Sequence, residues 1–266
     1  MNICICQLIK DEQRYIEEWI EYYINLGISK FILVEDWNST SHKEILNKYG
    51  DKIILHKLLD ILPHQKIWRL RQRIVWEYFF KIYKNDFDGC LFIDPDEYLI
   101  VDKQNFLEEI NIANDNHYKF IYYQWQIMSA NGHIKDPYPN QKYSVVNTYT
   151  YPGTPMVNLK NNGKLLILLN NVNSCLEFNV PHGVTNKNLR YYYISPYKLN
   201  HYLTKSFDEF FYRLYIKGEQ TKANYNRKIG DFFYINPDLN QYKDELLNKC
   251  SYFEYKYNKL KLENNS

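Results

Sequence analysis

The stretch LFIDPDEYLI, residues 91–100, places three carboxylates within a segment that otherwise has the composition of a buried strand. Apolar residues lead directly into Asp94, Asp96 and Glu97, and apolar residues follow them. Burying these charges without partners would cost several kcal/mol, so we expect a positive group to meet them. Pro95 has no N–H to donate, so the strand is expected to end at Asp94.

Around this stretch, apolar runs with strand periodicity alternate with segments of helical spacing. Acidic residues stand in the first turn of the first helical segment, and Gly27 is expected to end it. This β-α alternation predicts an α/β fold with a Rossmann-like, mostly parallel central sheet and helices on both faces. The expected strands cover residues 2–9, 30–36, 52–58 and 89–93, and the expected helices cover 11–26, 41–49 and 67–82.

The second half of the chain has a different pattern. Strand-like runs over residues 117–128, 141–152 and 164–173 are separated by segments rich in Gly, Pro and Asn, which predicts antiparallel strands and substrate-binding loops. Ser206 followed by Glu209 fits a capping box, which indicates a helix beginning there. A helical C-terminal extension is therefore expected.

Composition limits the class of protein to which the chain can belong. With 266 residues, 45% of them hydrophobic and 24% charged, the chain has the make-up of an ordinary globular protein, which excludes disordered and collagenous classes. The net charge of +2 does not point to nucleic acid, and no nucleic-acid partner is expected. The 27 tyrosines are spread over the whole chain, which favours a compositional bias of the source over a stacking surface.

The number and spacing of the cysteines indicate the cellular compartment. The five cysteines contain no C-x-x-C pair, and neither a signal peptide nor an apolar run of about 18 residues is present, so we expect reduced thiols in the cytoplasm. Cys4 and Cys6 alternate along the first expected strand and should both pack in the core. A chain without a long apolar run can still contact the inner face of the membrane peripherally. The sequence does not indicate an oligomeric state.

The carboxylates of residues 94–97 are expected at the mouth of a ligand crevice, because ligands of open α/β sheets bind beyond the carboxyl ends of the strands. An Asp-x-Asp there can hold Mn²⁺ or Mg²⁺, since carboxylate oxygens are preferred ligands and nucleotide phosphates can complete the shell. The candidate metal ligands are Asp94, Asp96 and His201. Arg69 and Arg73 share a helix face with Lys66 and could stabilise departing phosphates, although a solvated face is the alternative.

Residues 5–41, 71–100 and 199–218 together resemble the glycosyltransferase family 92 and family 2-like enzymes of bacterial surface-polysaccharide clusters. The members' K-N-E after the first strand corresponds to residues 10–12, and D-N-x-S-T after the second strand to Asp36 and residues 38–40. A Gln precedes F-I-D-x-D-E-F in the family as Gln72 precedes the acidic stretch here, and H-Y-x-T-K-S corresponds to residues 201–206. Asp11, where Asn is usual, and Trp37 depart from the pattern.

The resemblance implies a GT-A fold, a nucleotide-sugar donor such as a UDP-sugar, Mn²⁺ or Mg²⁺ at the D-x-D, and inversion at the anomeric carbon. The acceptor would be a saccharide or lipid-linked glycan of capsule or lipopolysaccharide synthesis. The expected domains are a core over residues 1–205, with a nucleotide-sugar half over about 1–102 and an acceptor half over about 103–205, and a helical extension over 206–266. The candidate donor-binding residues are Lys10, Glu12, Asp36, Asn38, Gln72, Arg69, Arg73, Asp94 and Lys205, and the candidate acceptor-binding residues are Trp125, His133 and His182.

Inversion requires a base that deprotonates the acceptor hydroxyl. Glu97, Asp136, Asp208 and Glu209 are candidates, and Glu97 is preferred only for its position. Two other classes compete with a glycosyltransferase. A carbohydrate-binding module would explain the aromatic residues but not the carboxylates at strand ends, and a phosphatase of the haloacid dehalogenase type would need Thr or Val where Tyr98 stands.

Overall fold

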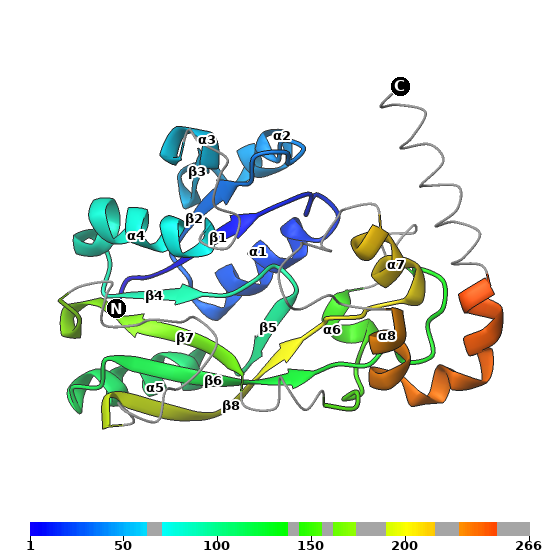
Figure 1. The fold of residues 1–266 in the computed structure, drawn as a ribbon. Coiled ribbons are helices and arrows are strands. Elements are labelled where there is room, and N and C mark those ends of the chain that lie inside the picture. The colour runs from blue at the N-terminus through cyan, green and yellow to red at the C-terminus, as the bar shows by residue number, and fades with distance from the viewer. Residues whose placement is uncertain (63–70, 138–143, 156–161, 174–189, 216–228, 249–266) are drawn as a thin grey trace. The chain divides into compact units, whose positions relative to one another are not determined.

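The computed structural model describes residues 1–62, 71–137, 144–155, 162–173, 190–215 and 229–248 (Figure 1). The chain divides into two compact units, which are taken separately below. The first unit comprises residues 1–126 and 158–201, and the second comprises residues 127–157 and 202–266. The predicted boundary near residue 205 remains a prediction.

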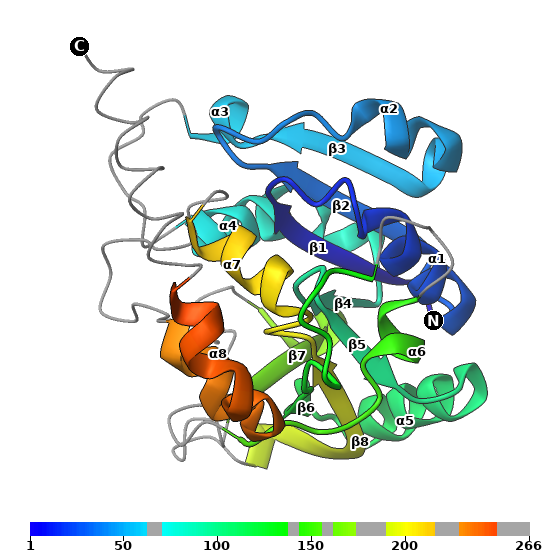
Figure 2. The same cartoon turned by 90° about the vertical axis from the view of Figure 1, so that its right-hand side faces the viewer.

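One sheet of eight strands organises the first unit, in the order β3-β2-β1-β4-β7-β6-β8-β5. Its parallel part consists of β1 (Ile3–Ile9), β2 (Lys30–Glu35), β3 (Ile53–Lys57) and β4 (Gly89–Phe92). Figure 2 shows β3, β2 and β1 side by side in this order. These four strands confirm the predicted β-α alternation.

Antiparallel pairing takes over beyond β4. β7 (Gly163–Leu168) pairs with β4 and with β6 (Phe120–Ile127), and β8 (Tyr192–His201) pairs with β5 (Glu97–Ile100). Two of the predicted antiparallel runs, 117–128 and 164–173, therefore join the same sheet as the parallel strands. The predicted α/β fold is confirmed.

Helices cover both faces of the parallel part. Successive strand residues point to opposite faces, and both sets of side chains are mostly apolar here, so each face needs a helix to bury it. Cys4 and Cys6 of β1 belong to the cluster that contains Val75 and Phe79 of α4 (Arg71–Tyr83), which confirms their predicted packing in the core. On the other face, the ring of Trp19 packs against that of Phe31, with centroids 5.7 Å apart.

Trp19 belongs to α1 (Ile16–Leu26), which ends as predicted at Gly27, whose φ is 112°. Glycine adopts this left-handed conformation without the steric cost of a Cβ. The unit also contains α2 (Lys43–Leu46), α3 (Leu58–Ile61), α5 (Lys103–Asp115) and the 3₁₀ turns η1 (Asn47–Lys52), η3 (Lys84–Asp86) and η6 (Leu169–Asn171).

The predicted strand over residues 141–152 is wrong in its described part. Residues of that run form the short helix α6 (Val145–Thr148), and Ser144 caps it by accepting a hydrogen bond from the N–H of Asn147 at 3.1 Å. The β-branched valines favour a strand locally, but a serine cap satisfies the first turn of a helix and decides the outcome. Neither α5 nor β8 was among the elements expected from the sequence.

Helices dominate the described part of the second unit. α7 (Phe207–Tyr215), α8 (Ile229–Ile235) and the 3₁₀ turn η9 (Pro237–Tyr242) contribute to one apolar cluster. Ser206 Oγ accepts a hydrogen bond from the N–H of Glu209 at 3.2 Å, which confirms the predicted start of α7. No helix in the described residues of either unit is long and apolar enough to cross a membrane.

Candidate functional site

Two loops at the carboxyl ends of β1 and β2 are tied together by Asp11. Asp11 Oδ1 accepts hydrogen bonds from the N–H and the hydroxyl of Thr40, both at 2.8 Å, and the N–H of Asp11 donates to Ser39 Oγ at 3.0 Å. Asp11 has φ of 50°, a left-handed conformation that Asp tolerates better than most residues. The carboxylate that departs from the family pattern thus holds the two loops in register.

A buried histidine makes a second connection between the same loops. His42 Nε2 accepts a hydrogen bond from the N–H of Glu12 at 2.9 Å, so the proton resides on Nδ1, which donates to Glu35 Oε1 at 3.1 Å. Burial lowers the pKa of His42, although the Glu35 carboxylate opposes this shift. The main chain of Glu12, a predicted donor-binding residue, is therefore fixed by a neutral imidazole.

Asp36 lies at the end of β2 against Arg71 of α4. The Asp36 carboxylate forms an ion pair with the Arg71 guanidinium, both side chains are largely buried, and the guanidinium lies 5.6 Å from the centroid of the Trp37 ring. Lys10 is half-buried and Asn38 is exposed in the neighbouring loops. A cation, a carboxylate and an aromatic face are thus brought together where a nucleotide of an open α/β sheet would bind.

Asp94 is surrounded by three donors. Its Oδ1 accepts hydrogen bonds from Gln7 Nε2 and, at 3.4 Å, from Gln72 Nε2, while its Oδ2 lies 2.7 Å from Lys164 Nζ. Gln72 was predicted at the donor site and does reach the acidic stretch. Lys164 is the positive group that the buried carboxylates of residues 94–97 required.

Lys164 is almost fully buried, and its ammonium also lies 3.7 Å from Glu97 Oε2. Burial by itself would lower the pKa of Lys164, but Asp94 and Glu97 outweigh it and raise the pKa, so the ammonium stays charged. Burial raises the pKa of Glu97 well above its usual range, and Lys164 opposes this only in part. The closest partner of the Lys164 ammonium is therefore the Asp94 carboxylate, and Glu97 Oε2 is its second acidic neighbour.

Glu97 is fully buried and holds the turn of the acidic stretch. Its Oε2 accepts a hydrogen bond from the N–H of Asp94 at 2.8 Å, and its carbonyl accepts hydrogen bonds from Trp19 and Tyr23 of α1. The catalytic role predicted for Glu97 stays a prediction.

Asp96 and His201 form the other half of the acidic site. The pairing of β5 with β8 sets Glu97 opposite His201, and His201 Nε2 lies 3.6 Å from Asp96 Oδ2. Trp125 of β6, a predicted acceptor-binding residue, packs on the imidazole with ring centroids 4.5 Å apart. Both side chains of the Asp96–His201 pair are largely buried.

The Asp96–His201 pair fits a divalent ion. Two ligands that each bind one ion at about 2.1 Å can lie up to about 4.2 Å apart, so the 3.6 Å separation of Oδ2 and Nε2 is within reach of a shared ion. No group of three His, Cys, Asp or Glu side chains gathers as a metal site in the described part of the chain.

Other predicted site residues lie elsewhere. Arg73 is on the exposed side of α4, where its Nε is 2.8 Å from Glu77 Oε1. His133, half-buried Asp136, and the buried residues Lys205 and Glu209 belong to the second unit. Arg69 and His182 lie outside the described residues, as does Lys66.

Sequence reasoning missed five residues of this site: Gln7, Glu35, His42, Arg71 and Lys164. Lys164 carried a detectable signal, since a charge within the apolar run of residues 164–169 mirrors the charges within residues 91–100. Residues 91–100 begin at the end of β4, and Lys164 lies in β7, the neighbour of β4 in the sheet, so opposite charges of the two segments are expected to meet.

Acidic, basic and aromatic groups gathered beyond the carboxyl ends of parallel strands are typical of the ligand sites of α/β enzymes. The chain belongs to glycosyltransferase family 92, which matches residues 1–236, and it is therefore a glycosyltransferase. The family assignment favours transfer over the carbohydrate-binding module and the phosphatase.

Solved structures give more distant similarities. S. aureus TarS 1–349 is 11% identical, with 91% of this chain and 72% of that chain covered and a TM-score of 0.42. Glucosyl-3-phosphoglycerate synthase from Mycobacterium tuberculosis, in complex with Mn²⁺, UDP and glucosyl-3-phosphoglycerate, is 17% identical over 47% of this chain and 44% of that chain, with a TM-score of 0.34. HddC from Yersinia pseudotuberculosis is 9% identical over 76% and 93%, with a TM-score of 0.40. No curated protein matches the chain.

Proposed function

We propose that this enzyme moves a sugar from a nucleotide-sugar donor, with a UDP-sugar the first candidate, to a hydroxyl of a saccharide or lipid-linked glycan. Anomeric inversion and a role in capsule or lipopolysaccharide synthesis complete the proposal. The observation that carries it is the 3.6 Å approach of Asp96 and His201 beside the Asp94–Lys164 ion pair, beyond the end of β4. A cytoplasmic setting is part of the proposal, with a lipid-linked acceptor presented at the inner face of the membrane.

Donor binding is assigned to the ends of β1 and β2. Asp36 is the predicted contact for the nucleoside, and the adjacent Arg71 guanidinium offers charge-assisted hydrogen bonds to phosphate oxygens. The loops that carry these groups are fixed by Asp11 and His42 before any donor arrives. Such preorganisation lowers the entropic cost of binding.

Mn²⁺ or Mg²⁺ would be held by Asp96 and His201, with donor phosphate oxygens completing the shell. The ion supplies neutralisation of the charge that develops on the leaving diphosphate. Asp94, the third predicted ligand, stays a candidate, since a carboxylate that accepts hydrogen bonds on both oxygens keeps lone pairs for an ion. The ion pair of Asp94 with Lys164 also fixes the acidic turn that presents Asp96.

The proposed reaction forms one bond and breaks another at the anomeric carbon. The acceptor oxygen bonds to this carbon, the bond to the diphosphate oxygen breaks, and the acceptor proton passes to a base. Glu97, Asp136, Asp208 and Glu209 remain candidates for this base. Asp136 is half-buried, whereas Glu209 is buried at the first turn of α7.

A donor screen tests the proposal. The thermal stability of the full chain is measured with UDP-, GDP-, CMP- and dTDP-sugars, each with and without Mn²⁺. A ligand present at 100 times its Kd adds about 2.7 kcal/mol to the free energy of unfolding, which gives a clear shift in Tm. We expect one nucleotide class to stabilise the enzyme only when Mn²⁺ is present, and Asp96→Asn to abolish that shift. If a donor stabilised the unmodified protein and Asp96→Asn equally without metal, the metal assignment would be contradicted. If no donor stabilised the unmodified protein, the proposed function would be contradicted.

A further inference from the structure

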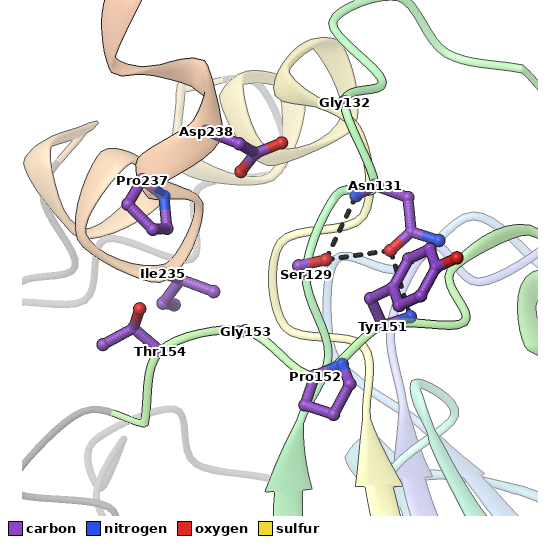
Figure 3. Close-up of a pocket in the computed structure, with 10 residues that line it drawn as sticks. All are labelled: Ser129, Asn131, Gly132, Tyr151, Pro152, Gly153, Thr154, Ile235, Pro237 and Asp238. Atoms are coloured by element: carbon purple, nitrogen blue, oxygen red, sulfur yellow. Dashed lines mark hydrogen bonds between the residues drawn. The ribbon is translucent and has the colours of Figure 1, made fainter.

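The second unit contains a pocket of about 420 Å³ that the site described above does not include. Three segments surround it in Figure 3: the loop at residues 129–132, the turn at residues 151–154, and the end of α8 with the start of η9 at residues 235–238. Its volume falls within the range of about 300–1,000 Å³ that is typical of small-molecule sites. Every segment around it belongs to the same compact unit.

Hydrogen bonds hold the three segments in place. The N–H of Ser129 donates to the carbonyl of Tyr151 at 2.9 Å, and the N–H of Thr154 donates to the carbonyl of Ile235 at 3.0 Å. Fully buried Asn236 accepts from the N–H of Ala130 through its side chain. These hydrogen bonds connect the three segments that line the pocket.

Gly153 allows the closest of these approaches. A Cβ at this position would lie 2.6 Å from Ile235 Cγ2 and 3.0 Å from the Ile235 carbonyl oxygen, so any other residue would push the end of α8 away. Asn131 stabilises the facing loop through a left-handed backbone with φ of 49° and through its side chain, which donates to Thr148 and Thr150. Both features maintain the width of the pocket.

The lining has the chemistry of a sugar site. Tyr151 is 69% exposed, although it is a large aromatic side chain, and Asp238 adds a carboxylate from an exposed position. Ser129 and Thr154 contribute hydroxyls, and none of the described lining residues is Lys, Arg or His. Among the described lining residues, Asp238 would repel a diphosphate, which favours an uncharged ligand over the nucleotide-sugar donor.

We infer that this pocket binds a neutral sugar ring of the acceptor glycan, with the apolar face of the ring on Tyr151 and its hydroxyls hydrogen-bonded to Asp238 and Thr154. The aromatic face attracts the polarised C–H bonds of a sugar, and a carboxylate accepts from two adjacent hydroxyls. This inference rests on the proposed glycosyl transfer, because it identifies the bound sugar as part of the acceptor.

Saturation-transfer NMR on the full chain tests the inference. The probes are methyl glucosides, methyl galactosides, methyl N-acetylglucosaminides, maltose and lactose, titrated into the unmodified protein, Tyr151→Ala and Asp238→Asn. Tyr212→Ala and Asp244→Asn are matched controls, since both residues are exposed in the same unit and do not line the pocket. We expect at least one probe to bind the unmodified protein and both controls equally, and to bind each pocket variant at least tenfold more weakly.

The outcomes separate this inference from the proposed function. Absence of binding by every probe, or binding that Tyr151→Ala and Asp238→Asn leave unchanged, overturns the pocket assignment. Nucleotide-sugar binding by the unmodified protein is measured in parallel. If the donor binds and the saccharides do not, only the pocket assignment fails; if no donor binds, the proposed function fails, whatever the saccharides do.

Discussion

Lys164 Nζ lies 2.7 Å from Asp94 Oδ2 although 70 positions separate the two residues in the sequence. The contact crosses from β7 to the end of β4, which are neighbours in the sheet. It supplies the cation for a set of carboxylates that would otherwise be buried at a cost of several kcal/mol. Lys164 is thus the residue on which the acidic turn depends.

Removal of this cation should destabilise the fold. In Lys164→Met the methylene chain is largely kept while Asp94 loses its charge partner, so we expect the free energy of unfolding to fall by about 3–5 kcal/mol in urea titrations. Adding Asp94→Asn to Lys164→Met should recover part of the loss, because the unpaired charge is then gone. A double variant that is no more stable than Lys164→Met would show that packing, and not charge, is responsible.

His201→Ala should impair chemistry more than folding. We expect kcat to fall tenfold or more, a loss of at least about 1.4 kcal/mol of transition-state stabilisation, and excess Mn²⁺ to restore part of it. His117→Asn serves as the control, since His117 is exposed and its left-handed backbone is tolerated by Asn. A lower Tm with kcat preserved would instead assign His201 to the fold.

Arg71→Ala should weaken donor binding. Its guanidinium pairs with Asp36 at the proposed nucleotide site, so steady-state kinetics should show a donor KM raised about tenfold, with the acceptor KM unchanged. Asp36→Ala is expected to act in the same direction. The control is Lys81→Ala, which removes an exposed cation from the same helix. A defect confined to the acceptor KM would contradict the assignment.

Gly163→Ala should disrupt the pairing of β6 and β7. A Cβ there would lie 2.1 Å from the carbonyl oxygen of Tyr123 and 2.8 Å from the Tyr122 ring, so the strands must separate, with a loss of about 1–3 kcal/mol or more. Gly230→Ala is the matched control. Its added Cβ meets nothing within 4 Å in helix α8, and helix propensity predicts a gain of up to about 1 kcal/mol. Equal effects of the two substitutions in urea unfolding would contradict this account.

Stability should also depend on pH through His42. Burial lowers the pKa of His42 in the folded state, so the unfolded state binds the proton more readily. The contribution of the neutral imidazole to the free energy of unfolding is therefore complete above the ordinary histidine pKa of about 6.5. It is lost as the pH falls below that value. We expect the free energy of unfolding of the unmodified protein to decrease more steeply from pH 7.5 to pH 5 than that of His42→Gln. Parallel pH profiles of the two proteins would exclude the effect.

Local pattern was sufficient for much of the fold. Strand periodicity and helical spacing located β1 to β4 and α1, because one buried face imposes its repeat on the sequence. Gly27 and Ser206 marked a helix end and a helix start through the backbone conformation and the hydrogen bond that each provides. Residues 145–148 were misread because a capping hydrogen bond outweighed the strand preference of valine.

The sequence by itself determined that the acidic stretch lies at the end of a buried strand and that its charges need a cation. Only the tertiary structure decided which cation. Lys164 meets Asp94 because an antiparallel strand from the second half of the chain pairs with β4, and Arg71 rather than Arg73 meets Asp36 because of the face that α4 turns toward the sheet. Such partners are set by strand order and helix rotation, which are properties of packing between distant segments and leave no repeat in the local sequence.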